Sequence, residues 1–431
     1  MNERPVRSPR PGRHVHAAAR WVLVALPALA LAHPAAGQGK TKSPTAAAWR
    51  QDTYTLGEPA AMEQAGYVSF GPFPFGDGHS TTDIEHVLGD EVKMRWVETA
   101  HFKIGSSLAA IKAPQDRKER RKLNAELAEL RDKLPRVRKR QKTLDPWLRL
   151  HLFAHRLEGL YRDLCDRLEV TDADFPGAGQ TEPATKPPAA GRMGKGPYLG
   201  QPSKYTVLLF AKRSSAGHYM QTFLGRDDGQ SLRHNFAQCG SLLFVVSTEE
   251  AAGALANDTA LHCHVVFAIV RNLVDGYRYY SRQIPAWFPL GLAHWHLRRI
   301  SERHNVYREA KRFDNQPDML WNWAPRVRAR AQHDHFVKAA EFLQWADTDE
   351  KTLVDSMMLW SRVDYLMSLG DKGFRTFLHL MKGPVPAVDP QPTMAEIQAL
   401  QIEALERAWG LTPESFDRQW KEWVSRHYPR K

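Results

Sequence analysis

Hydrophobic positions along the chain follow two spacings, which divide it into strands and helices. Short runs rich in β-forming residues predict strands at 93–104, 204–210 and 240–247. Apolar residues three and four positions apart indicate helices over 113–170 and again over 258–300. A short helix is expected between the second and third strands. Strands followed by helices predict an α+β fold, with a small sheet, a buried helical pair and a helical C-terminal subdomain.

The segment 113–170 is expected to form two helices joined near Leu134-Pro135. Four leucines recur at steps of four, three and four: Leu123, Leu127, Leu130 and Leu134. A broader apolar stripe runs from Trp147 to Leu168. Both patterns are typical of amphipathic helices that bury one face.

The remainder of the chain, 301–431, is expected to be a helical subdomain. Thr412 fits a helix N-cap, with Pro413 and Glu414 in the first turn. The inner face of this last helix is expected to bury four aromatic residues: Trp409, Phe416, Trp420 and Trp423.

The N-terminus is typical of an export signal. Five arginines precede the apolar run 21–32, which is too short to span a bilayer, and Ala35, Ala36 and Gly37 supply small residues for cleavage. We therefore predict a signal peptide at 1–37 and a periplasmic or extracellular protein. A disordered tail with a chance apolar run is the alternative, and an uncleaved anchor is a further one. No later run predicts a membrane helix.

Two segments lack a regular pattern. Residues 38–92 contain Gly, Pro and Ser breaks and are expected to form an irregular leader. Residues 171–203 are rich in Gly and Pro and predict a surface insertion. The main domain is then expected at 93–300.

The cysteines predict no disulfide framework. The chain has three, Cys165, Cys239 and Cys263, with no paired spacing. At most one bridge can form, and Cys263, on an apolar helix, is expected to be a small buried side chain.

Positive charge is concentrated in one stretch. Between Lys112 and Lys142 there are thirteen Lys and Arg residues and five Asp and Glu residues. Such a patch predicts a scaffold that binds an anionic polymer through Arg136, Arg138, Lys139 and Arg140. A solvated helix face is the alternative. No motif of a specific nucleic-acid binder is present.

The segment Asp258–Ile300 consists of an apolar helix, a short connection with Pro-Ala-Trp, and a second helix. This layout resembles the core of the gluzincin (peptidase MA clan) zinc metallopeptidases, which carry His-Glu-x-x-His on the first helix and a Glu ligand on the second. The strand containing His101 and the order strand, short helix, strand, helix are similar to that family as well. Trp287, Gly291, Leu292 and Ala293 match part of the second-helix motif.

The residues that the family uses for chemistry are missing. When His264 is taken as the first ligand, Val265 stands at the position of the base, Ala268 at the second ligand and Leu290 at the third. Starting instead at His262 places Cys263 and Val266 at the first two of these positions. The resemblance therefore implies the fold, without a catalytic residue or a cofactor.

The expected function is that of an exported, non-catalytic pseudo-peptidase. Its substrate cleft would remain as a binding groove lined by Trp287, Trp295, His294 and His264. A peptide or a cell-envelope polymer is the expected partner.

An active metallohydrolase with a rearranged zinc site is the alternative, built from His262, His264, His294 and His296. Residues two apart on a helix point about 200° away from each other, so the two members of one pair cannot share an ion. One histidine from each helix could do so, as in His264 with His294 or His262 with His296. A third ligand would have to come from His101 or Asp275.

Overall fold

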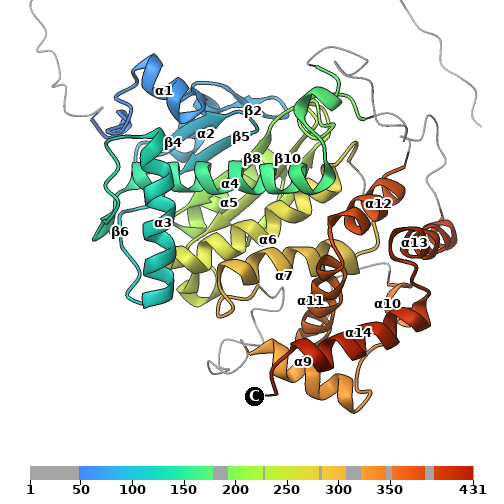
Figure 1. Cartoon of the computed structure of the whole chain (residues 1–431). Coiled ribbons are helices and arrows are strands. Elements are labelled where there is room, and N and C mark those ends of the chain that lie inside the picture. Colours follow the sequence, from blue (N-terminus) through green and yellow to red (C-terminus); the bar gives the residue numbers. More distant parts are fainter. Residues whose placement is uncertain are drawn as a thin grey trace, which may run out of the picture. The chain divides into compact units, whose positions relative to one another are not determined.

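The computed structural model describes residues 48–177, 193–226, 229–280, 284–306, 322–345, 352–383 and 393–430. The predicted signal peptide and residues 178–192 of the predicted insertion lie outside these ranges. The described chain has a mixed α+β fold, as predicted. A six-stranded sheet in the N-terminal half is followed by a mostly helical C-terminal region (Figure 1).

The sheet combines parallel and antiparallel strands. In spatial order it contains β1 (Tyr67–Ser69), β4 (Arg95–Thr99), β5 (Phe102–Ser106), β8 (Tyr205–Phe210), β10 (Ser241–Ser247) and β9 (Leu232–Phe236). The pairs β5–β8 and β8–β10 are parallel, whereas the remaining pairs are antiparallel. Every residue of β8 and β10 is buried, which explains why their sequences are continuously apolar rather than alternating.

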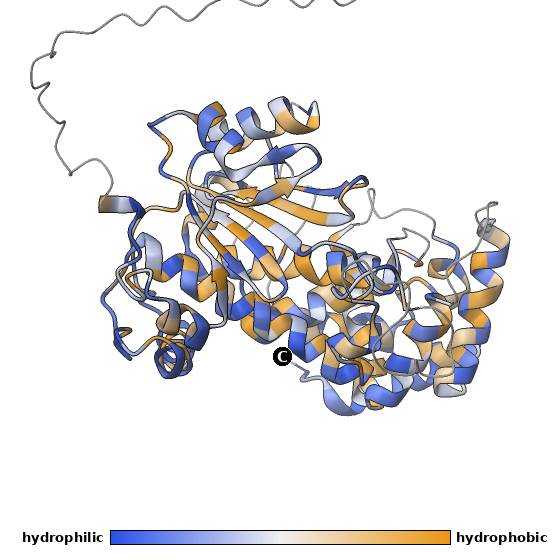
Figure 2. Cartoon of the chain, turned by 90° about the horizontal axis from the view of Figure 1, so that it is seen from above, coloured by the Kyte–Doolittle hydropathy of each residue, from blue (hydrophilic) through white to orange (hydrophobic). Residues whose placement is uncertain are grey.

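Helices cover both faces of the sheet. On one face, Leu243 and Val245 of β10 belong to a core with α2 (Thr81–Leu88) and α5 (Arg213–Leu224). On the other face, alternate β10 residues such as Phe244 join the larger core formed with the remaining helices. Figure 2 shows that hydrophobic residues gather in the strands between these layers.

The predicted strand at 93–104 is in fact two antiparallel strands, β4 and β5. The pattern misses the turn because Thr99 and Phe102 are both buried on either side of it. A carboxylate from another element completes the turn, since Glu158 accepts from the Thr99 hydroxyl at 2.5 Å and from the His101 amide at 2.9 Å.

The prediction of an irregular leader at 38–92 is wrong for its described part. That part contains η2 (Ala48–Arg50), α1 (Pro59–Ala65), β1, β2 (Pro74–Gly76), β3 (His79–Ser80) and α2. Strand β1 extends the main sheet by pairing with β4. The strands are only two or three residues long, so no periodicity could reveal them. Ser80 and Asp83 form a capping box that starts α2.

The expected basic hairpin is present. It consists of α3 (Arg117–Lys133) and α4 (Pro146–Leu168), with Asp116 and Asp145 capping their N-termini. The four leucines spaced along the first helix and its end are all buried. The chain between the helices is braced by β6 (Ile111–Lys112), which pairs with β7 (Thr143–Leu144).

The C-terminal region is helical, as predicted. Its helices are α9 (Trp323–Gln332), α10 (Ala339–Phe342), α11 (Leu353–Ser368), α12 (Asp371–Met381), α13 (Met394–Trp409) and α14 (Pro413–His427). Thr412 caps α14, and Phe416 and Trp420 are fully buried, which confirms the expected inner face. Trp409 and Trp423 pack against it while staying partly exposed.

All three cysteines are free, and Cys263 is buried as predicted. Among the described helices, none combines the length and the apolar character needed to cross a membrane.

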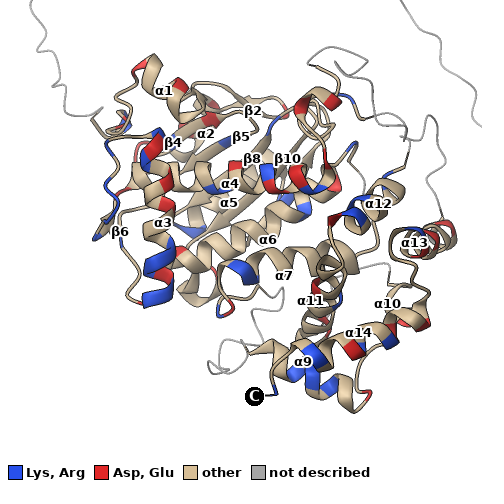
Figure 3. Cartoon of the chain, viewed as in Figure 1, with Lys and Arg blue, Asp and Glu red and all other residues tan. Residues whose placement is uncertain are grey.

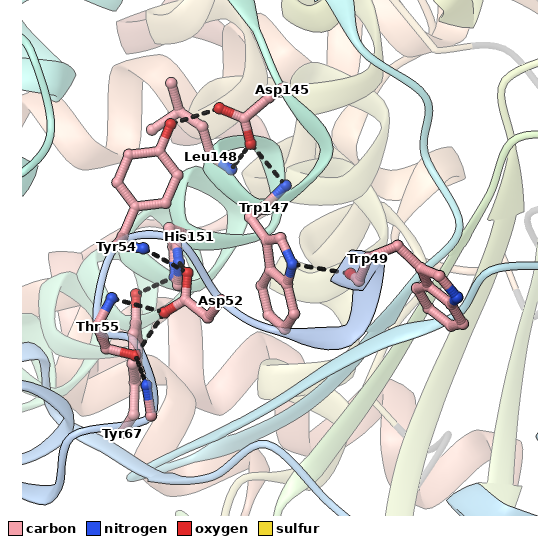
Figure 4. Close-up of polar contacts among 10 residues, drawn as sticks. Trp49, Asp52, Tyr54, Thr55, Tyr67, Asp145, Trp147, Leu148 and His151 are labelled. Atoms are coloured by element: carbon pink, nitrogen blue, oxygen red, sulfur yellow. Dashed lines mark hydrogen bonds and ion pairs between the residues drawn. The ribbon is translucent and has the colours of Figure 1, made fainter. Parts of the chain in front are cut away.

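A buried polar network fastens the chain after residue 48 to α4 (Figure 4). Asp52 accepts from the Thr55 amide and from His151 Nε2, both at 2.9 Å, and His151 Nδ1 lies 2.8 Å from the Tyr67 hydroxyl. Burial acts to raise the pKa of Asp52, but the hydrogen bonds and charge of His151 outweigh it and lower the pKa to about 2. Asp52, His151 and Tyr67 thus link the N-terminal segment, α4 and β1.

We expect Asp52→Asn to remove about 2 kcal/mol of unfolding free energy at pH 7. Because the folded pKa lies below the usual value, the stabilisation is complete above about pH 4 and is lost as the pH falls toward 2. Urea unfolding of both proteins at several pH values between 7 and 3 would measure this. The variant should lose part of the acid dependence, whereas Asp132→Asn, at an exposed carboxylate, should keep it. Equal acid dependence in wild type and Asp52→Asn would contradict the assignment.

Candidate functional site

Helices α6 (Asp258–Gly276) and α7 (Trp287–Ile300) occupy the segment that the sequence singled out. The Asn257 side chain accepts from the Ala260 amide and starts α6. This helix packs against β10, α4 and α7, so nearly all of it is buried. Only His264, Phe267 and Arg271 are partly exposed, and their spacing of three and four places them in one stripe.

The edge strand β9 borders this stripe. His264 Nε2 lies 3.0 Å from the hydroxyl of Ser231, which directly precedes the strand. Arg233 donates to Asp275 Oδ2 at 2.8 Å. Asn235 lies on the same face of β9 as Arg233, because both oppose β10 residues that join the larger core.

We refer to this region as the α6–β9 surface. It is made up of His264, Phe267 and Arg271 from α6 and Ser231, Arg233 and Asn235 from β9 or its start. Its side chains are polar, cationic and aromatic. No carboxylate is among them. Two carboxylates border them: Asp275 pairs with Arg233, and Glu250 accepts from the Ser231 amide at 2.8 Å.

The positions that the resemblance assigns to catalysis are apolar and enclosed. Val265 is fully buried, Ala268 is 4% exposed and Leu290 is 8% exposed. None of them can take up a proton or bind a metal ion, so general-base catalysis has no residue to perform it there.

His264 and His294 do not converge on a common point. His264 faces Ser231 and the Phe244 ring, whose centroid is 5.8 Å away. His294 instead lies between two aromatic rings, 4.8 Å from Phe267 and 5.1 Å from Trp323. Burial, with smaller contributions from Arg298 and Arg271, lowers the pKa of His294 to about 3.

The second pair is separated along α4. The His262 ring contacts Phe153 and lies near Glu126, whereas His296 Nδ1 is 3.9 Å from Asp163. Phe153 and Asp163 are ten residues apart on one helix, or about 15 Å. Burial lowers the pKa of His296 to about 4.

The two possible third ligands are occupied elsewhere. His101 lies 2.7 Å from Glu158 and 3.0 Å from Asp172, and Asp275 pairs with Arg233. Within the described ranges, no group of three or more His, Cys, Asp or Glu side chains is arranged to hold a metal ion. The residues present therefore do not fit a zinc site.

The predicted groove lining is largely inside the protein. Trp287 is fully buried, with its indole donating to Gln401 at 3.1 Å. His294 is buried as well. Trp295 keeps partial exposure, donates to Asp364 at 3.1 Å and lies between the guanidinium groups of Arg167 and Arg299. Of the four residues, only His264 belongs to the α6–β9 surface.

The predicted polyanion patch lies on a different part of the fold. Arg136, Arg138, Lys139 and Arg140 are all exposed in the loop between α3 and β7. Lysines and arginines gather along this loop and α3 in Figure 3.

Sequence reasoning missed β9, Phe267 and Arg271. The strand reads LRHNF, whose mixed character gives no strand periodicity. Phe267 and Arg271 follow His264 by three and seven residues, so a helical projection from His264 would have found the stripe.

Comparisons with protein-family models, with curated proteins and with solved structures found no match for this chain. The site is therefore interpreted from its own geometry.

The protonation states of His294 and His101 provide a test of the surroundings that the structure gives them. His294 should stay neutral from pH 8 to pH 5, because burial keeps its pKa near 3. His101 should stay protonated over the same range. Burial opposes its charge, but hydrogen bonds to Asp172 and Glu158 raise the pKa to about 9. Imidazole nitrogen chemical shifts measured by NMR would report both states.

The stabilisation that His101 contributes is complete below about pH 6.5 and is lost as the pH rises through 9. Glu158→Gln should move the His101 titration toward neutral pH and leave His294 unchanged. A His294 that titrates between pH 5 and 8 would contradict its burial between Phe267 and Trp323.

Proposed function

We propose that this protein is an exported, non-catalytic, peptidase-like binding protein that holds an extended polypeptide along the α6–β9 surface. The observation that carries the proposal is the position of β9. It forms an edge of the sheet directly beside the only partly exposed stripe of α6.

The absence of catalysis is supported by three side chains. Val265, Ala268 and Leu290 stand where the gluzincin resemblance places a base and two ligands, and all three are apolar and buried. A glutamate at such an enclosed position would carry a large desolvation cost unless it gained a metal or a cationic partner. Hydrophobic packing has taken the place of the reactive groups.

Peptide binding is supported by the sheet edge. In the part of the chain that the structure describes, β9 pairs with β10 alone. An edge strand offers backbone amides and carbonyls on its outer side, and an extended peptide can pair with them as an added strand. Such pairing binds the backbone of the peptide, so it does not require one particular peptide sequence.

Side chains of the α6–β9 surface supply the selectivity. Phe267 offers an aromatic face to an apolar side chain, and the neighbouring Arg271 guanidinium lies 5.6 Å from the Phe267 ring. An added strand would point alternate side chains toward α6. We therefore expect a preference for peptides that combine apolar and acidic residues at alternate positions.

Metal analysis tests the non-catalytic half of the proposal. After chelation, re-exposure to zinc and dialysis, the protein should retain well under one zinc ion per chain, because its histidines do not converge. Elemental mass spectrometry gives the metal content. Near one ion per chain, lost in the double variant His264→Ala and His294→Ala, would overturn the proposal and favour the metallohydrolase.

Peptide binding tests the other half. Random peptides of about six to ten residues, the length of ordinary strands, should include binders that slow amide exchange in β9 and leave β1 unaffected. Phe267→Ser should weaken their binding about tenfold, as expected for losing about 1.4 kcal/mol of apolar contact.

Val68→Ser, at an exposed position of the opposite edge strand β1, is the matched control and should bind as the wild type does. Failure to find any binder, or equal loss in both variants, would contradict the proposed surface.

A further inference from the structure

The last turn of α3 and the loop between α3 and β7 carry a concentration of positive charge that peptide binding does not use. From Arg131 to Lys142 there are seven Lys and Arg residues and one acidic residue, Asp132. Six of the seven cations are exposed, and Lys133 is partly exposed. None of the seven side chains forms an ion pair or hydrogen bond with another described residue. Their charge is therefore directed at solvent.

Buried side chains and backbone hydrogen bonds anchor this loop to the fold. Leu134 and Val137, which lie between the cations, and Leu144, which follows them in β7, are almost completely buried. The Val137 amide donates to the Leu134 carbonyl at 2.9 Å, and the Ala113 amide donates to the Lys142 carbonyl at 3.0 Å. Because the backbone is pinned at these points, the exposed cations lose less conformational freedom on binding a ligand.

The loop lies at the sheet edge opposite to β9. Gln64 of α1 donates to the Asp132 carbonyl, and α1 packs against the edge strand β1. The chain just after the loop is tied to the N-terminal segment, because Tyr54 donates to Asp145 at the start of α4. A ligand on this loop would thus leave the α6–β9 surface free.

The composition of the loop narrows the class of ligand. It contains no aromatic residue on which a nucleic-acid base could stack. Its large aliphatic side chains are buried, so none is available to enter a bilayer, and stable membrane attachment needs more than a basic patch. Three of the four central cations are arginines, whose planar guanidinium groups match phosphate oxygens in a bidentate manner.

We infer that this anchored cationic loop binds a linear phosphate polymer that carries no bases. Recognition would be electrostatic, through Arg136, Arg138, Lys139 and Arg140 along the polymer backbone. This inference is independent of the proposed peptide surface, and either can fail without the other.

The test compares two variants of equal net charge, with long-chain inorganic polyphosphate as the probe. The loop variant changes Arg136, Arg138, Lys139 and Arg140 to Gln. The control variant changes four scattered, exposed cations to Gln: Lys93, Lys212, Lys372 and Arg418. Binding measured by fluorescence anisotropy at low salt should fall at least tenfold in the loop variant and less than twofold in the control.

The salt dependence gives a second readout. Each phosphate contact contributes roughly 0.7–0.9 to the slope of log affinity against log salt, so the loop variant should lose about three units of slope. Equal losses in both variants would show that net charge alone matters and would overturn the inference.

Two competing ligands test whether the loop prefers nucleic acid or a membrane surface to a base-free polymer. Tighter binding of single-stranded DNA at equal phosphate concentration, or of vesicles containing anionic lipid, would overturn the choice of a base-free polymer. Circular dichroism of both variants confirms that the fold is kept. Unchanged peptide binding in the loop variant would confirm that the two surfaces act separately.

Discussion

Burial of α6 is the constraint on which the rest of the fold depends. One helix contacts β10, α4 and α7, and α7 in turn packs against α11. This second contact is so close that a side chain at Gly291 would meet Val363 at 2.5 Å and the Leu359 carbonyl at 2.6 Å. Val265 of α6 is fully buried in this packing. A charged base at that position would lose its hydration, so the packing that joins the sheet to the C-terminal helices disfavours one there.

Charged and basic side chains at the two ends of α6 are buried together with ionic or hydrogen-bonding partners. Asp258, at the start of α6, receives Arg156 Nη2 at 2.9 Å and lies near Arg149. At the other end of the helix, Lys382 Nζ donates to the Asp275 and Tyr279 carbonyls at 2.6 and 2.9 Å. Both ends of α6 are thus held by basic side chains from segments distant in sequence. Removing one partner of such a buried pair costs more than the pair itself contributes, so these contacts fix where the helix lies.

The two surfaces proposed for binding differ in their physical character. On the α6–β9 surface, affinity would come from backbone pairing and from contact with Phe267, so it should depend weakly on salt. The α3–β7 loop offers only exposed cations on a braced backbone, and its binding should fall steeply as salt rises. A protein with both could hold an extended polypeptide while attached to an anionic polymer.

The sequence by itself determined the elements with a strong local pattern. These are the leucine-spaced α3, the continuously apolar strands β8 and β10, the apolar α6 and the capped α14. These elements can be predicted from the local order of apolar and polar residues, without knowing which other elements pack against them. Residue identity alone also shows that Val265, Ala268 and Leu290 can neither take up a proton nor bind a metal ion. Only the tertiary structure decided the turn at His101, the short strands before α2 and the place of β9 at the sheet edge. It also decided that Trp287 is buried and that the four histidines face different neighbours. These properties arise from contacts between residues far apart in the chain, such as Glu158 with His101 and Gln401 with Trp287, which leave no periodic trace in the sequence.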